Sequence, residues 1–342
     1  MDNIFTGLIP DPRTDDQKAK DYLHDEVYGA SFVDWKEKTD FRNFPIRNQN
    51  GSGQCVAFST AKALGVNNKV ETGEFLTLSP RDIYTRRKNK DTTGMYLQDA
   101  GDISKKYGST LDSLMPSDNL TEAQANNSSD RTPESEKLAL MYRANGYVFI
   151  GNDSNVMDNI AQAIDKGYAP VLTNRFHISE WTDEPKILVP TEQANNFHAI
   201  TIVDYFLKNG EKCFMIEDSW GSQYGNNGRR ILSETWVRAR MTGCMYLIDW
   251  VYSPVTKPKH TFSQVMIYGQ ENSEISALQD VLKYEGLIPS NVESTGFFGS
   301  ITAKAVMNFQ LKYNVAPLVE IKALQGKRCG KKTLQKLNEL YS

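Results

Sequence analysis

A cysteine, a histidine and an aspartate in this chain have the chemical types and the order that acyl transfer by a thiol requires. Cys55 ends a polar segment, His198 lies 143 residues further on, and Asp218 follows 20 residues later. A thiol attacks a carbonyl carbon as the thiolate, so it needs a neighbouring base or an electropositive environment. A histidine supplies the base, and an acidic side chain orients the imidazole. The spacing therefore predicts a triad of Cys55, His198 and Asp218.

The residues around Cys55 predict how its thiol is activated. Residues 48–54 are Asn, Gln, Gly and Ser, a composition typical of a turn. The largely apolar run over 56–66 predicts a buried helix that begins at Cys55 and ends near residues 67–68. The sulfur would then lie at a helix N-terminus, where the helix dipole favours negative charge.

The segment before the nucleophile resembles that of the papain-like cysteine peptidases. Members of this family carry a glutamine, a glycine-rich turn and then the cysteine. Gln49 stands six residues before Cys55 and matches the glutamine whose side chain helps to form the oxyanion hole. The backbone N–H of Cys55 would supply the other donor.

The two downstream segments resemble the same family. His198 lies in the strand-like run 197–203 and matches the family's base. The family motif Asn-Ser-Trp-Gly stands here as Asp218-Ser-Trp-Gly, and Trp220 is expected to cover the histidine–aspartate pair. The separation of cysteine and histidine also agrees with the roughly 130–150 residues of such enzymes. A buried core cysteine and a satisfied core histidine are the alternatives, and the joint occurrence of the motifs favours catalysis.

Two positions depart from the usual family pattern. Asp218 replaces an asparagine, so the third triad role would be filled by a charged group. Ser52 stands where secreted relatives often have a disulfide cysteine. Both features also occur in the phage and bacterial branch of the family, which this chain resembles.

The resemblance implies an α+β, papain-like two-lobed fold with a helical lobe and a β-barrel-like lobe, and the hydrophobic patterns agree with it. Helices are predicted to start at Pro80, with Ser79 as the cap, and to span 97–107, while 116–137 is predicted to be a surface loop. Strands are predicted at 147–150, 169–173, 197–205, 212–217, 230–232 and 244–248.

Composition divides the chain into four parts. Residues 1–30 are polar and form an N-terminal leader that is either loosely ordered or draped on the core. Residues 31–252 form the peptidase domain. A run with two prolines marks a linker at 253–264, and residues 265–342 form a separate small domain.

The C-terminal part resembles the peptidoglycan-binding-like three-helix domain found at the ends of many cell-wall enzymes. Helical spacing of apolar residues predicts three short helices. The residues that carry the resemblance are Leu278, Gln279, Leu287, Thr295–Gly299, Thr302, Ala305, Val306, Phe309, Gln310, Thr333, Leu334, Leu337 and Asn338. Most of these positions are structural, so the resemblance implies peptidoglycan as a partner of residues 265–342 without indicating the groove that binds it.

Composition excludes several other functions. The net charge of −3 provides no basic field for nucleic acid, and no run of 18 apolar residues predicts a membrane span. The N-terminus lacks the features of a signal peptide. Cys213 and Cys244 are predicted to be buried free thiols. No cysteine–histidine cluster has zinc spacing, so neither a metal nor another cofactor is expected. His177 is predicted to be a surface or cleft-wall histidine.

These features predict a cysteine endopeptidase that hydrolyses peptide bonds in a peptide or protein substrate and is directed to the bacterial cell wall by its C-terminal domain. The cleaved bond would lie in the murein stem peptide or in a wall-associated protein, with proteins favoured. An alternative is a catalytically idle structural or adhesion component of a phage particle or cell surface that keeps the peptidase fold. A third interpretation keeps the catalysis and assigns the C-terminal domain a protein partner.

Overall fold

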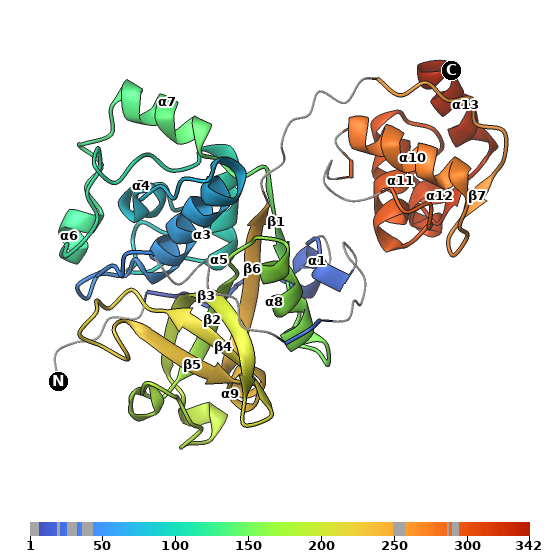
Figure 1. Cartoon of the computed structure of the whole chain (residues 1–342). Helices are drawn as coiled ribbons and strands as arrows, with labels where there is room; N and C mark the ends of the chain where they lie inside the picture. The colour runs from blue at the N-terminus through green and yellow to red at the C-terminus, as the bar shows by residue number, and fades with distance from the viewer. Residues whose placement is uncertain are drawn as a thin grey trace. The chain divides into compact units, whose positions relative to one another are not determined.

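The computed structural model describes residues 7–18, 21–25, 33–35, 44–248, 257–285, 287–288 and 294–342. The chain divides into two compact units. The described residues of the N-terminal unit end at Ile248, and those of the C-terminal unit begin at Lys257. Figure 1 shows the elements of each unit. Residues 249–256, which include the start of the predicted linker, lie outside the described residues.

Helices dominate the first half of the N-terminal unit. The long helix α3 (Cys55–Thr72) packs against α4 (Pro80–Tyr84) and α5 (Leu97–Lys106) (Figure 1). α3 continues past the predicted end at residues 67–68 because Gly73, with φ of 83°, supplies the left-handed C-cap. The predicted start of α4 and extent of α5 are confirmed.

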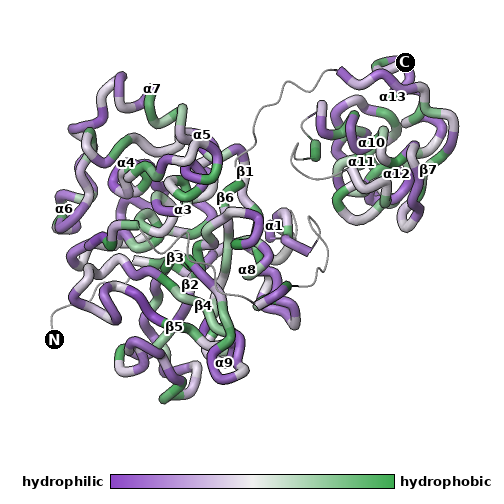
Figure 2. Tube along the Cα trace, viewed as in Figure 1, coloured by the Kyte–Doolittle hydropathy of each residue, from purple (hydrophilic) through white to green (hydrophobic). Residues whose placement is uncertain are grey.

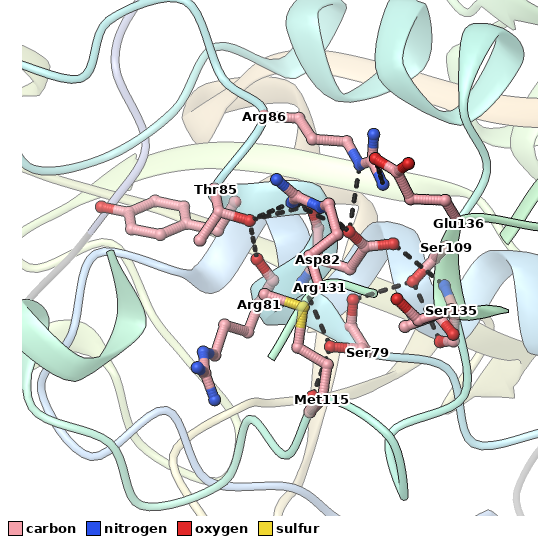
Figure 3. Close-up of polar contacts among 12 residues, drawn as sticks. Ser79, Arg81, Asp82, Thr85, Arg86, Ser109, Met115, Arg131, Ser135 and Glu136 are labelled. Carbon is pink, nitrogen blue, oxygen red and sulfur yellow. Dashed lines mark hydrogen bonds and ion pairs between the residues drawn. The ribbon is translucent and has the colours of Figure 1, made fainter. Parts of the chain in front are cut away.

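A buried carboxylate fixes the start of α4. The backbone N–H of Asp82 donates to Ser79 Oγ at 3.1 Å, which confirms the predicted cap. The Asp82 side chain accepts hydrogen bonds from Arg131 at 2.9 Å, Arg86 at 3.0 Å and the backbone of Thr110 at 3.1 Å (Figure 3). Because both carboxylate oxygens are satisfied by fixed donors, this cluster has the character of a structural tie between neighbouring loops.

The prediction of a surface loop over 116–137 is partly wrong. The segment contains the short helix α6 (Glu122–Ala125) and the start of α7 (Pro133–Met141). Thr121 and Thr132 each form a reciprocal capping box with the residue three positions later. Such boxes satisfy the free N–H groups of a helix start and stabilise helices even in a polar, Ser- and Asn-rich sequence.

The second half of the N-terminal unit is a six-stranded antiparallel sheet, which confirms the predicted strands apart from shifts at their ends. The order is β1-β6-β2-β3-β4-β5. Its strands are β1 (Gly146–Phe149), β2 (Val171–Phe176), β3 (Asn196–Lys208), β4 (Glu211–Glu217), β5 (Arg229–Ser233) and β6 (Met241–Ile248). Further elements of this unit are α1 (Asp15–Lys18), α8 (Val156–Asp165), α9 (Glu234–Arg240) and the 3₁₀ helices Ile178–Glu180 and Thr191–Gln193.

The core of this unit lies where α3 packs on β3. β3 is buried from His198 to Tyr205, and α3 is buried from Cys55 to Ala61. A helix that crosses a sheet in this way brings its N-terminus next to one end of the central strands. The contact therefore sets the distance between residues that are far apart in the sequence.

The described residues of the C-terminal unit contain the three predicted helices and one more. The predicted helices are α10 (Ser273–Tyr284), α11 (Ser300–Lys312) and α13 (Lys331–Tyr341). A short helix α12 (Leu318–Leu324) and a two-stranded sheet of β7 (Met266–Ile267) and β8 (Arg328–Cys329) were not predicted. Hydrophobic and hydrophilic residues alternate along its helices, as the changes between green and purple show (Figure 2).

The C-terminal unit begins before the predicted boundary at residue 265. The side chain of Phe262 is buried, and its backbone exchanges hydrogen bonds with Asn338 at 2.7 and 2.9 Å. The backbone N–H of His260 donates to the carbonyl of Tyr341 at 2.8 Å. Residues 260–262, which the composition assigned to the linker, therefore form part of the folded unit.

Two buried glutamines reveal an internal repeat in this unit. Gln279 Nε2 donates to the carbonyl of Phe297 at 2.9 Å and to Thr302 Oγ1 at 3.0 Å. The corresponding bonds of Gln310, to Arg328 and Thr333, are both 3.0 Å long. Each partner in the second set lies 31 residues after its counterpart. The unit is thus built from two similar halves, each closed by an amide clamp.

In the part of the chain that the structure describes, no helix combines the length and hydropathy needed to cross a lipid bilayer.

Candidate active site

Cys55 is the first residue of α3 and lies at an uncompensated helix N-terminus. Gln54 at the N-cap makes no side-chain capping bond, and the first turn holds no acidic residue. The preceding turn is tight because Asn50 and Gly51 adopt φ values of 48° and 78° and Ser52 Oγ donates to the carbonyl of Gln49 at 2.6 Å. The backbone N–H groups of the first turn therefore remain available to an anion at Cys55.

The sheet brings His198 and Asp218 together. His198 lies near the start of β3, and Asp218 directly follows β4, its neighbour in the sheet. His198 Nε2 and Asp218 Oδ1 are 2.7 Å apart, and both side chains are completely buried. The other ring nitrogen, Nδ1, is buried and has no hydrogen-bond partner among the described residues. Cys55 contributes to the raised pKa of His198, which places its thiol near the imidazole, and Nδ1 is the nitrogen left to receive it.

The electrostatics of the pair favour the imidazolium. Burial by itself lowers the pKa of His198, but the charge and hydrogen bond of Asp218, together with Cys55, outweigh it and raise this pKa to about 9. Burial likewise raises the pKa of Asp218, and the opposing effects of His198, Arg230 and Trp181 leave it below its ordinary value. At neutral pH the site therefore holds a carboxylate beside a protonated histidine.

Asp218 has two further partners that the motifs did not predict. Its Oδ2 accepts hydrogen bonds from Trp181 Nε1 at 2.9 Å and from Arg230 Nε at 3.2 Å. Trp181 follows the first 3₁₀ helix and Arg230 lies on β5, so neither belongs to a motif around a triad residue. Glu217, by contrast, pairs with Arg229 and Lys62 and not with His198, because neighbouring residues of an extended segment point to opposite faces.

Gln49 is tied to the segment that follows Asp218. Its backbone N–H donates to the carbonyl of Ser219 at 2.8 Å, and its side-chain Oε1 accepts from Ser219 Oγ at 2.6 Å. Its Nε2 donates to the carbonyl of Ser52 at 2.5 Å. A glutamine amide nitrogen carries two N–H groups, and these bonds hold it beside the turn that leads to Cys55.

The aromatic side chain of Trp220 lies against the histidine. The two ring centroids are 4.8 Å apart, and Trp220 is 6% exposed. Trp181 meets the same imidazole edge-on at 6.0 Å. The two indoles therefore exclude water from the His198–Asp218 bond. His177 belongs to a different local contact: its Nδ1 lies 2.7 Å from Ser179 Oγ at the start of a 3₁₀ helix.

The other three cysteines have the properties of structural thiols. All four cysteines are free and buried. Burial is the main cause that raises the pKa of Cys213 to about 11 and that of Cys329 to about 12, and it also raises the pKa of Cys244. The prediction that Cys213 and Cys244 are buried free thiols is confirmed.

A piece of the N-terminal leader runs beside the turn that precedes Cys55, so its residues 7–9 are draped on the core. Leu8 forms a parallel bridge with Met95, in which the N–H of Met95 donates to Gly7 at 2.7 Å and that of Ile9 donates to Met95 at 3.1 Å. Gly7 lies so close to Gly53 that a Cβ atom on Gly7 would fall 1.9 Å from the Gly53 carbonyl oxygen. The sequence offered no signal for this contact.

Comparisons with known proteins agree with this geometry. Residues 30–240 match the family described as papain family cysteine protease. Cathepsin K of Mus musculus is 25% identical over 245 residues, which cover 67% of this chain and 68% of that protein. A cathepsin L-like proteinase of Phaedon cochleariae is 23% identical, with coverage of 59% and 60%. The second alignment thus spans less than two thirds of the relative's length.

Solved structures show the same architecture. Xylellain, a cysteine protease from Xylella fastidiosa, superposes with a TM-score of 0.55 at 16% identity, over 72% of this chain and 97% of that one. Digestive procathepsin L 3 of Tenebrio molitor has the same TM-score and identity, over 72% of this chain and 76% of its own. These matches confirm the predicted α+β, papain-like fold.

Proposed function

Because this chain belongs to the papain family of cysteine proteases, a family of hydrolases, we propose that it is an endopeptidase whose nucleophile is Cys55. The observation that carries the proposal is the buried 2.7 Å contact between His198 and Asp218, which leaves the other ring nitrogen of His198 buried and without a hydrogen-bond partner among the described residues. Cys55 also lies at the positive end of α3. These features are what a thiolate–imidazolium pair requires.

The geometry supports the following sequence of steps. The Cys55 thiolate attacks the peptide carbonyl carbon, and the resulting oxyanion is held by the backbone N–H of Cys55 and the side-chain amide of Gln49. The imidazolium of His198 then transfers its proton to the leaving nitrogen as the C–N bond breaks. His198 next takes a proton from water, which attacks the thioester and releases the acid. Departure of the thiolate restores the initial pair.

Asp218 and Trp220 support these steps without touching the substrate. Asp218 holds the imidazole in the orientation that presents Nδ1 to the thiol, and its charge stabilises the imidazolium. Trp220 covers the bond between the two side chains and keeps water away from it. Exclusion of water strengthens the electrostatic interaction that keeps His198 protonated.

A labelling experiment with a hydrolysis assay tests this proposal. Iodoacetamide at mildly acidic pH, followed by mass spectrometry, should modify Cys55 and leave Cys213, Cys244 and Cys329 unmodified in the native chain. Cys55→Ala should lower kcat/KM on a peptide substrate by about 10³-fold or more without unfolding the protein, whereas Cys213→Ala should retain activity. Equal labelling of the four thiols, or hydrolysis by the Cys55→Ala variant, would contradict the assignment.

We further propose that the C-terminal unit directs the enzyme to the peptidoglycan of bacteria. Support comes from the matched residues of the peptidoglycan-binding-like domain and from two exposed aromatic side chains, Tyr268 and Phe297. Their segments lie side by side, since backbone bonds join Gly269 and Gln270 to Phe298 at 2.9 and 2.8 Å. Two exposed aromatic side chains on neighbouring segments suit a surface that contacts a ligand.

Sedimentation with purified murein tests this part. The Cys55→Ala chain should sediment with murein, and a chain that ends at Lys257 should stay in solution. Tyr268→Ala and Phe297→Ala should weaken binding, whereas Val319→Ala, at an 81% exposed site on α12, is the matched control. Equal sedimentation of the truncated chain would remove the wall-binding role. Mass spectrometry of the wild-type digest of murein and of a peptide library would then show whether stem peptides or proteins are cleaved.

A further inference from the structure

The carboxylate of Asp218 has a complete and asymmetric set of donors. Oδ1 accepts from His198 Nε2 at 2.7 Å and from the backbone N–H of Ser219 at 2.8 Å. Oδ2 accepts from Trp181 Nε1 at 2.9 Å and from Arg230 Nε at 3.2 Å. Oδ1 therefore binds the histidine, and Oδ2 binds the permanently charged guanidinium of Arg230 together with Trp181.

Arg230 is held for this contact from several directions. Its side chain is 3% exposed, its NH1 donates to the carbonyl of Thr182 at 2.9 Å, and its guanidinium lies 5.0 Å from the ring centre of Trp181. Gly225 leaves room for it, because a Cβ atom there would come within 3.3 Å of Arg230 Cγ and NH1. A guanidinium so deeply buried needs an anion, and Asp218 is its ion-pair partner.

A charge count shows what this pair does for the site. A thiolate and an imidazolium together are neutral, so the asparagine typical of this family leaves the site neutral. Asp218 adds one negative charge, and Arg230 restores neutrality. We propose that Arg230, with Trp181, is a positioning residue that neutralises and orients Asp218, so that the aspartate can replace the neutral amide of the family. The inference rests on the proposed triad.

The other charged groups near Asp218 already have partners of their own. Glu217 forms ion pairs with Arg229 and Lys62, and burial followed by the charge of Arg229 lowers the pKa of Lys62 well below its ordinary value. A small cavity on this side is lined by Arg47, which pairs with Asp112 and Asp118. Arg230 is therefore the cation that balances Asp218.

The variants Asp218→Asn, Arg230→Met and their combination separate this role from simple structural support. Arg230→Met leaves the site with one extra negative charge. This charge should raise the pKa values of both the Cys55 thiol and the His198 imidazolium, so both limbs of the pH profile should move to higher pH. Asp218→Asn leaves an unpaired buried cation, and both limbs should move to lower pH. Each single variant should lower kcat/KM by about tenfold or more. The double variant restores neutrality and should be several times more active than Asp218→Asn alone, with limbs close to those of the wild type.

Two control variants and one further comparison make the outcome decisive. Arg229→Met removes a cation from the neighbouring position on β5, whose partner is Glu217, and should leave both limbs unchanged. Arg230→Lys keeps the charge without the guanidinium geometry, so its limbs should stay near those of the wild type. If Arg230→Met fails to fold, the activities of the double variant and of Asp218→Asn still distinguish the two roles of Arg230. If Arg230 were purely structural, the double variant would be less active than Asp218→Asn. That result, or unshifted limbs in a folded Arg230→Met, would overturn the inference.

The pH profiles should be recorded in two ways. Peptide hydrolysis gives kcat/KM, and the rate of Cys55 alkylation by iodoacetamide reports the thiolate–imidazolium pair without any peptide substrate. Shifted alkylation profiles in a chain that hydrolyses no peptide would support the role of Arg230 and contradict the proposed function. Unshifted alkylation profiles in an active peptidase would do the reverse.

Discussion

The two units bury polar side chains in different ways. In the described part of the C-terminal unit the buried polar residues are all uncharged, namely Gln279, Thr302, Gln310 and Thr333, and the two glutamines repeat one pattern of bonds. In the N-terminal unit the buried set includes charged side chains, and those around Asp218 follow no repeat. A neutral amide bonded to carbonyls and hydroxyls closes a loop, whereas a buried ion pair with a titratable member can move a proton. Burial alone thus does not distinguish a structural polar group from a functional one, but charge and partner type do.

The largest effect should come from the titratable member of the buried cluster. His198→Ala removes the base, and kcat/KM on a peptide substrate should fall by about 10² to 10⁴-fold. The free energy of unfolding of the C-terminal unit should not change. His177→Ala is the control: it removes the other histidine of the sheet-containing half of the N-terminal unit and should leave kcat/KM unchanged. An active His198→Ala variant would show that the charged cluster is as structural as the amide clamps.

Removal of the Asp218 carboxylate should lower kcat/KM less than His198→Ala does, and it should shift the alkaline limb in a defined direction. The pKa of His198, raised to about 9 largely by Asp218, should fall in Asp218→Ala, because the imidazolium loses its negative neighbour while Arg230 remains. The alkaline limb of kcat/KM should therefore move to lower pH, with a loss of about 10- to 100-fold at its maximum.

Asp158→Ala is the control for that substitution, because Asp158 pairs with Lys212 and Trp35 on another face of the unit. Its alkaline limb should match that of the wild type. An unchanged alkaline limb of kcat/KM in Asp218→Ala would mean that a group other than Asp218 orients the His198 imidazole and stabilises its charge.

The amide clamps should affect stability alone. Gln279→Leu leaves the N–H of Gly296 and the carbonyl of Phe297 without this partner, at a cost of about 2–4 kcal/mol in the unfolding free energy of the C-terminal unit. Four of the five tryptophans, Trp35, Trp181, Trp220 and Trp236, lie in the described part of the N-terminal unit. In a urea titration tryptophan fluorescence should therefore follow mainly that unit, while circular dichroism follows both.

Gln335→Leu, at an exposed position on α13, is the matched control and should leave both transitions in place. Hydrolysis of a soluble peptide should be unchanged in both glutamine variants. A loss of activity in Gln279→Leu would show that the clamp reaches beyond its own unit.

The smallest effect concerns the leader residues beside the nucleophile. Leu8 is buried beside Met95, and Leu8→Ser should weaken this contact by roughly 1–2 kcal/mol, which raises the uncovered fraction by about tenfold. Alkylation of Cys55, whose side chain is fully buried in this structure, should accelerate by up to that factor.

Pro10→Ala, at an exposed position of the same segment, should leave the alkylation rate unchanged. Equal alkylation rates in Leu8→Ser and the wild type would show that the segment does not limit access to the thiol.

The sequence by itself determined the order and identity of the central residues. Cys55, His198 and Asp218 each lie in a short local motif, and the apolar runs around the last two predicted the strands β3 and β4. Helix ends were predicted less well, because α6 and α7 depend on capping bonds that composition hides. The α3 end likewise depended on one glycine conformation.

The tertiary structure alone decided which groups surround Asp218. Trp181 and Arg230 come from a loop and a strand that no motif connects with Cys55, His198 or Asp218, and β-sheet register together with the turn at Gly225 brings them to one oxygen of Asp218. The leader contact at Gly53 and the repeated glutamine clamps were equally hidden. A short sequence motif reflects the local backbone conformation around a reactive side chain. The partner of a buried charge depends on long-range packing, which leaves no fixed spacing in the sequence.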